Sequence, residues 1–208
     1  MKIAVIGANG RAGSKIVAEI INRGVDVTAI VRGNNKSMAE KFISKDIFAL
    51  TKDDLKNFDV VIDCFGAWSA ETLPLHTKTS QYLCDLLSGS DIRLIIIGGA
   101  GSLYVDENKT QLYKTKGFPA EYIPTAKAQA DELAELRKRN DVKWTFVSPA
   151  ADFRADGERT GKYILAGEEF TVNSKGESVI SYADYAIALV DEAINGKNIQ
   201  KRISVLGE

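Results

Sequence analysis

Short apolar runs alternate with amphipathic segments along most of the chain. The first run covers residues 3–6 and leads through three glycines into residues 14–23, where apolar side chains recur at the helical period. The expected strands of the main sheet are 3–6, 25–31, 47–50, 59–65, 93–97 and 143–147. The expected helices are 14–23, 36–42, 53–58, 75–87 and 125–139. Fully apolar strands separated by helices indicate a parallel sheet that is covered on both faces.

This pattern predicts an α/β fold, with one Rossmann domain over residues 1–208. Right-handed crossovers give a doubly wound parallel sheet in the order 3-2-1-4-5-6, with helices on both faces. After residue 149 the periodicity changes. Further short strands are expected at 163–166, 169–172 and 203–206, and a last helix at 181–194. We interpret the segment from about residue 150 onward as a small C-terminal cap on the substrate side.

Three glycines separate the first strand from the first helix. Glycines at this place let the backbone approach a diphosphate, and the free N–H groups and dipole of a helix N-terminus favour negative charge. The spacing G-x-x-G-x-x-G is the variant associated with short-chain dehydrogenases, although a strand–turn–helix unit can also use glycines for packing alone. The pattern favours dinucleotide binding. The residues expected around the phosphates are Gly7, Asn9, Gly10, Arg11, Ala12 and Gly13.

Arg32 follows the second expected strand. An NAD-preferring site usually holds a carboxylate there, which bonds the ribose 2′-OH. Here Arg11, Arg32 and Lys36 instead bring positive charge to the place of a 2′-phosphate, whose geometry a guanidinium matches. The alternative is an ordinary solvated loop arginine. The pattern favours NADP(H), with NAD(H) as the second possibility.

Other candidates follow the remaining strands, because ligands of such sheets bind beyond the carboxyl ends of the strands. Gly98, Gly99 and Ser102 follow the fifth strand, where a nicotinamide would lie, and Ser102 is a candidate hydrogen-bond donor. A flexible turn is the alternative reading of these glycines. The residues expected near the adenosine are Asp46, Ile47, Phe65, Gly66 and Ala67.

The usual acid–base pair of short-chain dehydrogenases, Tyr-x-x-x-Lys, is absent. Tyr122 and Lys127 are five positions apart, a spacing that does not bring them onto one helical face as well as four does. Residues 103–123 lack periodicity and are rich in aromatic side chains, which fits either a lid over a planar ligand or packing onto the protein body. Ser102 and Tyr122 are the catalytic candidates. For His76, a helix-start or surface role is favoured over catalysis.

Several stretches resemble the atypical short-chain dehydrogenases known as NADH-flavin reductases or NAD(P)-binding proteins, a group related to biliverdin-IXβ/flavin reductases and NmrA-like proteins. These stretches are 6–13, 97–102, 118–122, 144–150, 157–161 and 181–186. The resemblance implies a single Rossmann domain, NADP(H) or NAD(H), and reduction of flavins or similar planar acceptors. A flavin would be a substrate rather than a prosthetic group. The group commonly lacks Tyr-x-x-x-Lys.

Flavin reduction needs little acid–base chemistry from a protein, because the cofactors carry the hydride transfer and the site stacks the rings and excludes water. Ser102 would then hydrogen-bond the acceptor, and Pro149 and Ala150 would flank the nicotinamide.

Composition narrows the choice of partners. A net charge of −1 gives no electrostatic reason to expect nucleic acid or an anionic membrane, and the apolar runs are strand-sized. Cys64 and Cys84 lack the spacing of a metal site or a disulfide framework, so no metal is expected. Reduced cysteines and a start directly on a core strand predict a cytoplasmic location.

Three functions remain open from the sequence. The first is an NADPH-dependent reductase of flavin or another flat acceptor. The second is a redox sensor or regulatory protein that binds NADP(H) without turning it over. The third is an isomerase or epimerase of a sugar nucleotide, which the short C-terminal region disfavours because such substrates need a larger cap.

Overall fold

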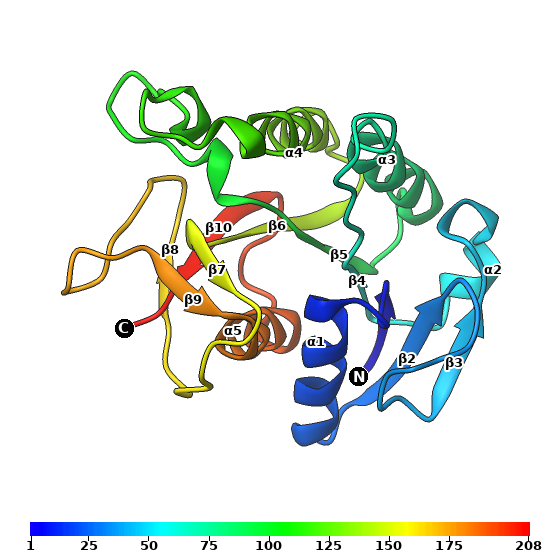
Figure 1. The fold of residues 1–208 in the computed structure, drawn as a ribbon. Coiled ribbons are helices and arrows are strands. Elements are labelled where there is room, and N and C mark those ends of the chain that lie inside the picture. The colour runs from blue at the N-terminus through cyan, green and yellow to red at the C-terminus, as the bar shows by residue number, and fades with distance from the viewer.

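Apolar strands that alternate with amphipathic helices form one large sheet, and the computed structural model describes all 208 residues (Figure 1). The strands of the large sheet are β1 (Lys2–Ile6), β2 (Asp26–Val31), β3 (Lys41–Ser44), β4 (Val60–Asp63), β5 (Arg93–Ile97), β6 (Lys143–Pro149), β8 (Ile164–Ala166) and β10 (Lys201–Leu206). A second, two-stranded sheet consists of β7 (Asp152–Arg154) and β9 (Val179–Ser181). The helices are α1 (Arg11–Asn22), α2 (Lys52–Leu55), α3 (Leu75–Leu87), α4 (Ile123–Leu136) and α5 (Tyr182–Asn195). Short 3-10 turns cover Ile47–Ala49, Ala100–Ser102, Leu112–Lys114 and Ala120–Tyr122.

The large sheet has the strand order β3-β2-β1-β4-β5-β6-β10-β8. All neighbours are parallel except β10 and β8, which are antiparallel. The order expected from the sequence is confirmed as a doubly wound, Rossmann-like α/β domain, which β10 and β8 extend. Figure 1 shows α1 and α5 on one face of the sheet and α3 and α4 on the other. None of the helices combines the length and the apolar character that crossing a bilayer requires.

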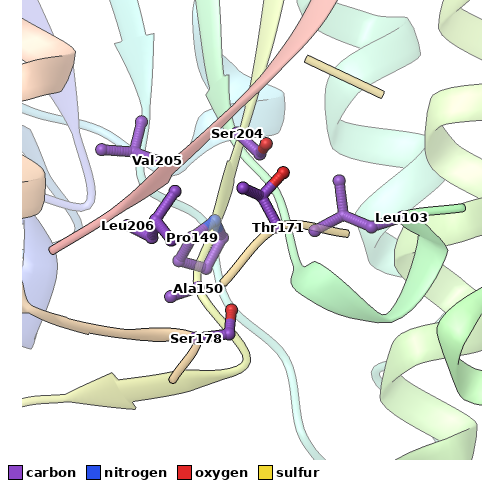
Figure 2. A pocket seen from close by; sticks show the side chains of 8 residues that line it. All are labelled: Leu103, Pro149, Ala150, Thr171, Ser178, Ser204, Val205 and Leu206. Carbon is purple, nitrogen blue, oxygen red and sulfur yellow. The ribbon is translucent and has the colours of Figure 1, made fainter. Parts of the chain in front are cut away.

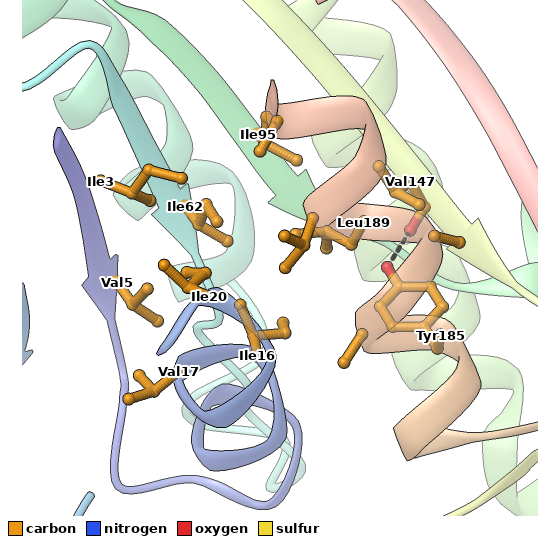
Figure 3. Close-up of a cluster of buried hydrophobic side chains, with 14 of the residues drawn as sticks. Ile3, Val5, Ile16, Val17, Ile20, Ile62, Ile95, Val147, Tyr185 and Leu189 are labelled. Carbon is orange, nitrogen blue, oxygen red and sulfur yellow. Dashed lines mark hydrogen bonds between the residues drawn. The ribbon is translucent and has the colours of Figure 1, made fainter. Parts of the chain in front are cut away.

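Each face of the sheet has its own hydrophobic core, because alternate side chains of a strand point to opposite faces. In β1, Ile3 and Val5 belong to the cluster under α1 and α5, whereas Ala4 belongs to the cluster under α3 and α4. Figure 3 shows the first cluster, in which Ile3 and Val5 face the apolar side of α1. The buried hydroxyl of Tyr185 donates a 2.7 Å hydrogen bond to the Val147 carbonyl, so its polar atom is satisfied within the core.

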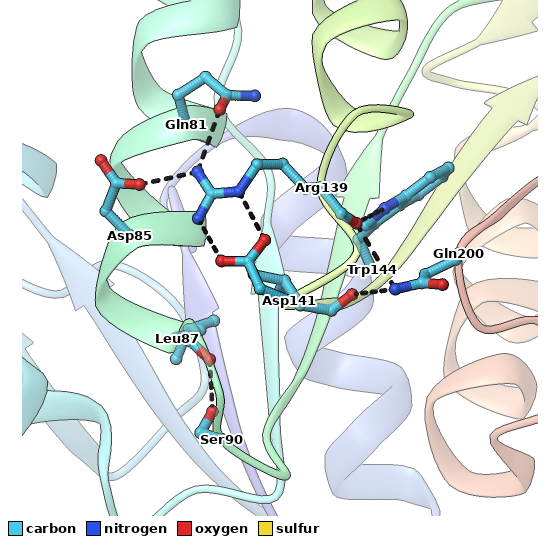
Figure 4. Close-up of polar contacts among 9 residues, drawn as sticks. Gln81, Asp85, Leu87, Ser90, Arg139, Asp141, Trp144 and Gln200 are labelled. Carbon is cyan, nitrogen blue, oxygen red and sulfur yellow. Dashed lines mark hydrogen bonds and ion pairs between the residues drawn. The ribbon is translucent and has the colours of Figure 1, made fainter.

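A polar cluster fixes the end of α4 against α3 and β6 (Figure 4). The Arg139 guanidinium donates to Asp85 of α3 at 2.7 Å and makes two bonds, of 2.9 and 2.8 Å, with Asp141. These bonds hold the pKa of Asp141 well below its ordinary value. The Arg139 carbonyl accepts a 3.1 Å hydrogen bond from the Trp144 indole. The contacts set the relative position of α3 and α4, the two helices that supply buried polar groups to the site.

The segment between β2 and β3 is an open loop, and the helix expected at residues 36–42 is wrong. The Asn35 side chain donates to the Ala39 carbonyl at 2.7 Å and accepts from the Ser37 backbone at 3.0 Å. Asparagine side chains that bond the local backbone in this way compete with helix formation.

The third strand of the sheet is β3, and the strand expected at residues 47–50 is wrong. Those residues form the 3-10 turn Ile47–Ala49, which the Asp46 carboxylate caps by accepting from the Phe48 backbone at 3.0 Å. β3 lies at the edge of the sheet with mostly exposed side chains. It therefore lacks the continuous apolar run that identifies the inner strands.

After β6 the strand expected at 163–166 is confirmed as β8, but the one expected at 169–172 is wrong. In place of the second strand, Glu169 makes an isolated bridge with Tyr104. β7 and β9 were not predicted, because three-residue strands carry too little periodicity. The other helices and strands differ from their expected bounds by at most three residues at either end.

Residues 103–123 are fastened to the C-terminal part of the chain. The Tyr104 backbone donates to the Glu168 carbonyl at 3.0 Å, and the Phe170 backbone donates to the Tyr104 carbonyl at 2.8 Å. The Arg202 guanidinium lies over the Tyr104 ring, 5.2 Å from its centroid. Of the two interpretations of this segment, these contacts support packing onto the protein body rather than a free lid.

We expect Gly13→Ala to lower the free energy of unfolding by about 1–3 kcal/mol, the usual cost of forcing a methyl group into a packed contact. A Cβ at Gly13 would lie 2.4 Å from the Gly7 carbonyl oxygen, so α1 would have to move off the turn that follows β1. Urea unfolding measures the change. Gly33→Ala is the matched control, because a Cβ at Gly33 meets nothing within 4 Å. Equal stability of the two variants would contradict the close contact.

Candidate functional site

The turn after β1 lies where the chain connections of the sheet diverge, since β1 has β2 on one side and β4 on the other. Gly7 has a φ of +72°, which favours glycine, and a Cβ there would lie 2.9 Å from the Cys64 carbonyl oxygen. The turn therefore packs directly on the residue that follows β4. Gly7 and the residues after β4 meet at the point where sheets of this kind hold their ligands.

The N-terminus of α1 is open to an anion. Gly10 is the N-cap residue, no side chain caps the helix, and its first turn holds no acidic residue. The first N–H groups of a helix have no partner within it, and here they belong to Arg11, Ala12 and Gly13. A Cβ at Gly10 would meet only the Gly7 carbonyl oxygen, at 3.1 Å. The space in front of the helix is thus lined by backbone donors.

The Asn9 side chain joins this turn to the loop that carries Arg32. Its amide nitrogen donates to the Asn34 carbonyl at 2.9 Å, and its oxygen accepts from the Lys36 backbone at 2.7 Å. Arg11, Arg32 and Lys36 are exposed and take part in none of the ion pairs of the protein. Sequence reasoning placed Asn9 at the phosphates, whereas its side chain bonds the neighbouring loop. The sequence could not predict that Asn9 ties the turn to the loop, because these bonds join residues far apart in the chain.

The two residues expected near an adenine lie beyond β3. The exposed Asp46 caps the 3-10 turn that follows it, so one of its carboxylate oxygens is already bonded. Ile47 is buried in the cluster under α3 and α4. Asp46 thus presents a polar group at the surface, and Ile47 contributes mainly to the core.

The loop after β4 is held from below by two buried side chains. Asp63 Oδ1 accepts a 2.9 Å hydrogen bond from the Phe65 backbone, and His76 Nε2 lies 3.2 Å from the Ala67 carbonyl. The Phe65 ring packs edge-on against the His76 imidazole, with 5.5 Å between centroids. Trp68, which follows this loop, is 73% exposed. The expected site residues 65–67 are therefore tied to groups that sequence reasoning did not assign to the site.

Three ionisable side chains lie buried beneath that loop: Asp63 of β4, His76 of α3 and Glu132 of α4. His76 does begin a helix, as expected, but it is not a surface residue. Burial raises the pKa of Asp63 to about 6 and lowers that of His76. Burial and the Asp63 carboxylate raise the pKa of Glu132 well above its ordinary value. A single carboxylate within an apolar strand was the signal that could have drawn attention to Asp63.

The glycines after β5 make their close contacts within the protein. A Cβ at Gly98 would lie 2.0 Å from the Phe146 ring, and one at Gly99 would lie 2.1 Å from Oε1 of Gln129. A side chain at Gly98 would displace the buried Phe146 ring, whereas one at Gly99 would meet only the flexible end of the Gln129 side chain, which can move aside. Internal packing therefore accounts for Gly98, and contact of both glycines with a cofactor stays a prediction.

The two catalytic candidates have opposite surroundings. Ser102 is 2% exposed, and its hydroxyl accepts a 3.0 Å hydrogen bond from Arg202, which also pairs with Glu168. Tyr122 is 57% exposed, directly before α4, and has no side-chain hydrogen bond. Lys127 pairs with Asp131 at 2.6 Å instead of with a tyrosine. Only Tyr122 of the two presents its hydroxyl to solvent.

Pro149 and Ala150 line a small pocket at the end of β6 (Figure 2). Leu103, Thr171 and Ser178 face them from the loop after β5 and from the C-terminal segment. The space in the pocket is about 10 Å³, room for one water molecule. A planar ring next to Pro149 and Ala150 would therefore lie at the mouth of this pocket, not inside it.

A family model described as NAD(P)H-binding matches residues 7–193 of the chain. The chain is 44% identical over 212 residues to the protein YwnB of Bacillus subtilis (strain 168), covering 100% of this chain and 99% of YwnB. A solved structure named "putative NADH-flavin reductase", from Streptococcus pneumoniae TIGR4, is 60% identical with a TM-score of 0.98 and covers 100% of both chains. A structure named "putative epimerase", from Bacteroides thetaiotaomicron, is 34% identical with a TM-score of 0.87, covering 99% of this chain and 96% of that one.

We expect Asp63→Asn to stabilise the protein at high pH and to change little in acid. With a pKa of about 6 in the folded protein and 3.8 as its ordinary value, Asp63 binds more protons when folded, so stability falls as the pH rises through this window. The gain above pH ~7 is up to about 3 kcal/mol. Asparagine keeps an oxygen for the Phe65 backbone. Urea unfolding at acidic and at alkaline pH measures the change in the free energy of unfolding, and Asp156→Asn, at an exposed position, is the control. A gain of equal size at both pH values would contradict the assignment.

Proposed function

The chain belongs to the NAD(P)H-binding family, and on that premise we propose that it is an NADPH-dependent reductase of flavin or a similar planar acceptor. The observation that carries this proposal is the open N-terminus of α1, which itself begins with the unpaired cation Arg11, beside two further unpaired cations, Arg32 and Lys36, on the loop that Asn9 holds. Backbone donors at a helix N-terminus suit a diphosphate, and guanidinium groups suit a phosphate monoester. Of the two nicotinamide cofactors, only NADP(H) carries both.

In this proposal the diphosphate lies against the backbone of Gly10, Arg11, Ala12 and Gly13, with Gly7 setting the turn. The 2′-phosphate lies beside Arg32, with Arg11 and Lys36 near it. Two features support the arrangement. The cations have no carboxylate to neutralise them, and Asn9 bonds the loop of Arg32 and Lys36 to the turn.

The rest of the dinucleotide follows the carboxyl edge of the sheet. Asp46 and Ile47 lie at the adenine side, and residues 65–67 lie under the ribose. The nicotinamide lies toward Gly98 and Gly99 and the mouth of the pocket at Pro149 and Ala150. The segment from about residue 150 onward forms the acceptor side, as expected from the sequence.

When bound, NADPH supplies a hydride to the acceptor and one proton completes the reduction. The work of the protein is to align the two rings and exclude water. Tyr122 is accessible to the acceptor and is the proposed proton donor. The Ser102 hydroxyl accepts a hydrogen bond from Arg202 and thereby supports the turn after β5. Ser102 would contact the acceptor only after this hydrogen bond breaks.

A sensor of the NADP(H) redox state is the second candidate. Two observations favour the sensor, because both leave little space for a substrate. The pocket at Pro149 has room for only one water molecule, and Ser102 is buried. Because a similar structure, from Bacteroides thetaiotaomicron, is named a "putative epimerase", epimerisation is a third function to test.

We expect Arg32→Ala to weaken NADP⁺ binding about tenfold or more and to leave NAD⁺ binding unchanged, because a charge-assisted bond contributes ~1.5–3 kcal/mol. Calorimetric titration measures both affinities. Lys56→Ala, an exposed cation next to Asp59 and Val60 at the start of β4, is the matched control. Equal affinity of the wild type for the two nucleotides would remove the 2′-phosphate argument.

We expect NADPH oxidation in the presence of FMN, FAD, quinones or biliverdin, followed by absorbance under steady-state conditions. Gly10→Val is the binding-deficient control: its Cβ would meet only the Gly7 carbonyl oxygen, at 3.1 Å, and its methyl groups would extend into the space proposed for the phosphates. This variant should fold and should lose both nucleotide binding and turnover. Tight NADP⁺ binding without turnover of any acceptor would favour the sensor instead.

A further inference from the structure

His76 is placed to control the loop that lies under the proposed ribose. It is buried at the start of α3, and its Nε2 reaches the Ala67 carbonyl at 3.2 Å. A carbonyl oxygen can only accept a hydrogen bond, so Nε2 must carry a hydrogen. This contact fixes the protonation of one of the two ring nitrogens.

The other ring nitrogen faces a carboxyl group. Nδ1 of His76 lies 3.8 Å from Oε2 of Glu132, and that oxygen has no hydrogen-bond partner. A neutral ring with Nε2 protonated turns a lone pair toward Glu132. The separation of 3.8 Å is longer than a hydrogen bond, but a lone pair and a carboxylate that face each other in a buried site still repel unless one of the two groups carries a proton. The contact therefore requires a proton, either on the carboxyl group or on the ring.

No cation nearby relieves this requirement. The titratable groups around Glu132 are Asp63 from β4 and His76 from α3, and the nearby Ser80 hydroxyl donates to the Thr77 carbonyl at 3.1 Å. Further along α3, Cys84 lies near both Glu132 and Arg139. No lysine or arginine pairs with Asp63, His76 or Glu132. Asp63 Oδ2 is likewise buried without a partner, so the cluster holds excess negative charge unless protons remain bound.

We propose that His76 is a positioning residue for the nucleotide, and that it holds residues 65–67 in place while the His76–Glu132 pair retains one proton besides the one on Nε2. The inference rests on the proposed function for the place of the nucleotide, but not for the proton itself. When Glu132 loses its proton, the imidazole turns from the carboxylate and the support of the Ala67 carbonyl is lost. NADP⁺ affinity then falls toward high pH.

Nitrogen NMR tests the protonation of this pair without any nucleotide. His76 is the single histidine of the chain, so ¹⁵N-histidine labelling reports on this site alone. We expect Nε2 to stay protonated from about pH 5.5 to about pH 8, with no free titration in that range. A ring that titrates near its ordinary value of about 6.5 with both tautomers populated would overturn the proposal.

Paired variants of Glu132 test the link to binding. Glu132→Gln keeps an N–H donor for Nδ1 at every pH, so NADP⁺ affinity should match that of the wild type near pH ~6 and lose its pH dependence. Glu132→Leu has no donor, and we expect about tenfold weaker binding at all pH values. His76→Gln, which can still donate to the Ala67 carbonyl, should bind more tightly than His76→Leu.

Calorimetric titration across the pH range measures these affinities, and circular dichroism checks that each variant is folded. Affinities of Glu132→Gln and Glu132→Leu that both equal the wild type would overturn the role of the proton in binding. If the wild type binds no NADP⁺ at any pH, the proposed function fails, and the NMR titration alone decides whether the His76–Glu132 pair retains its proton.

Discussion

The contact between Gly13 and the Gly7 carbonyl determines how the rest of the site is built. Because neither residue has a side chain, α1 lies directly on the turn after β1 and its N-terminus points along the carboxyl edge of the sheet. The same turn packs on the Cys64 carbonyl, which fixes the end of β4 and the loop that follows. Two loops and a helix terminus therefore converge on one point, and that point depends on a space that a single methyl group would fill.

The charged side chains around this point are separated by sign and by burial. Unpaired cations lie on the loop after β2, held by Asn9, whereas Asp63 and Glu132 are buried under the loop after β4 without a cation of their own. The positive groups are exposed and available to an anion. The acidic groups are shielded from solvent and affect the surface only through the backbone they support. The first group suits recognition, and the second suits control of loop position.

The inner strands and the glycine turn could be predicted from the sequence because burial imposes a continuous apolar run and a turn before a helix imposes glycine. The edge strand β3 could not be predicted in this way, because its side chains are mostly exposed and its sequence resembles that of a loop. The cations of the site were visible as residues after a strand. The clamp of Asn9 and the buried trio around His76 were not, because each depends on contacts between residues far apart in the chain. The sequence also did not show the neighbours of Gly98 and Gly99 within the protein, Phe146 and Gln129, and contact of these glycines with a ligand stays a prediction.

The packing of Gly98 also limits which substitutions the protein can accept at the end of β5. A side chain at Gly98 would collide with the buried Phe146 ring, so invariance at this position among relatives would report packing against β6 and carry no information about the ligand. For the proposed reductase, we expect new acceptor preferences to arise instead from substitutions at positions such as the exposed Trp68, which leave the sheet intact.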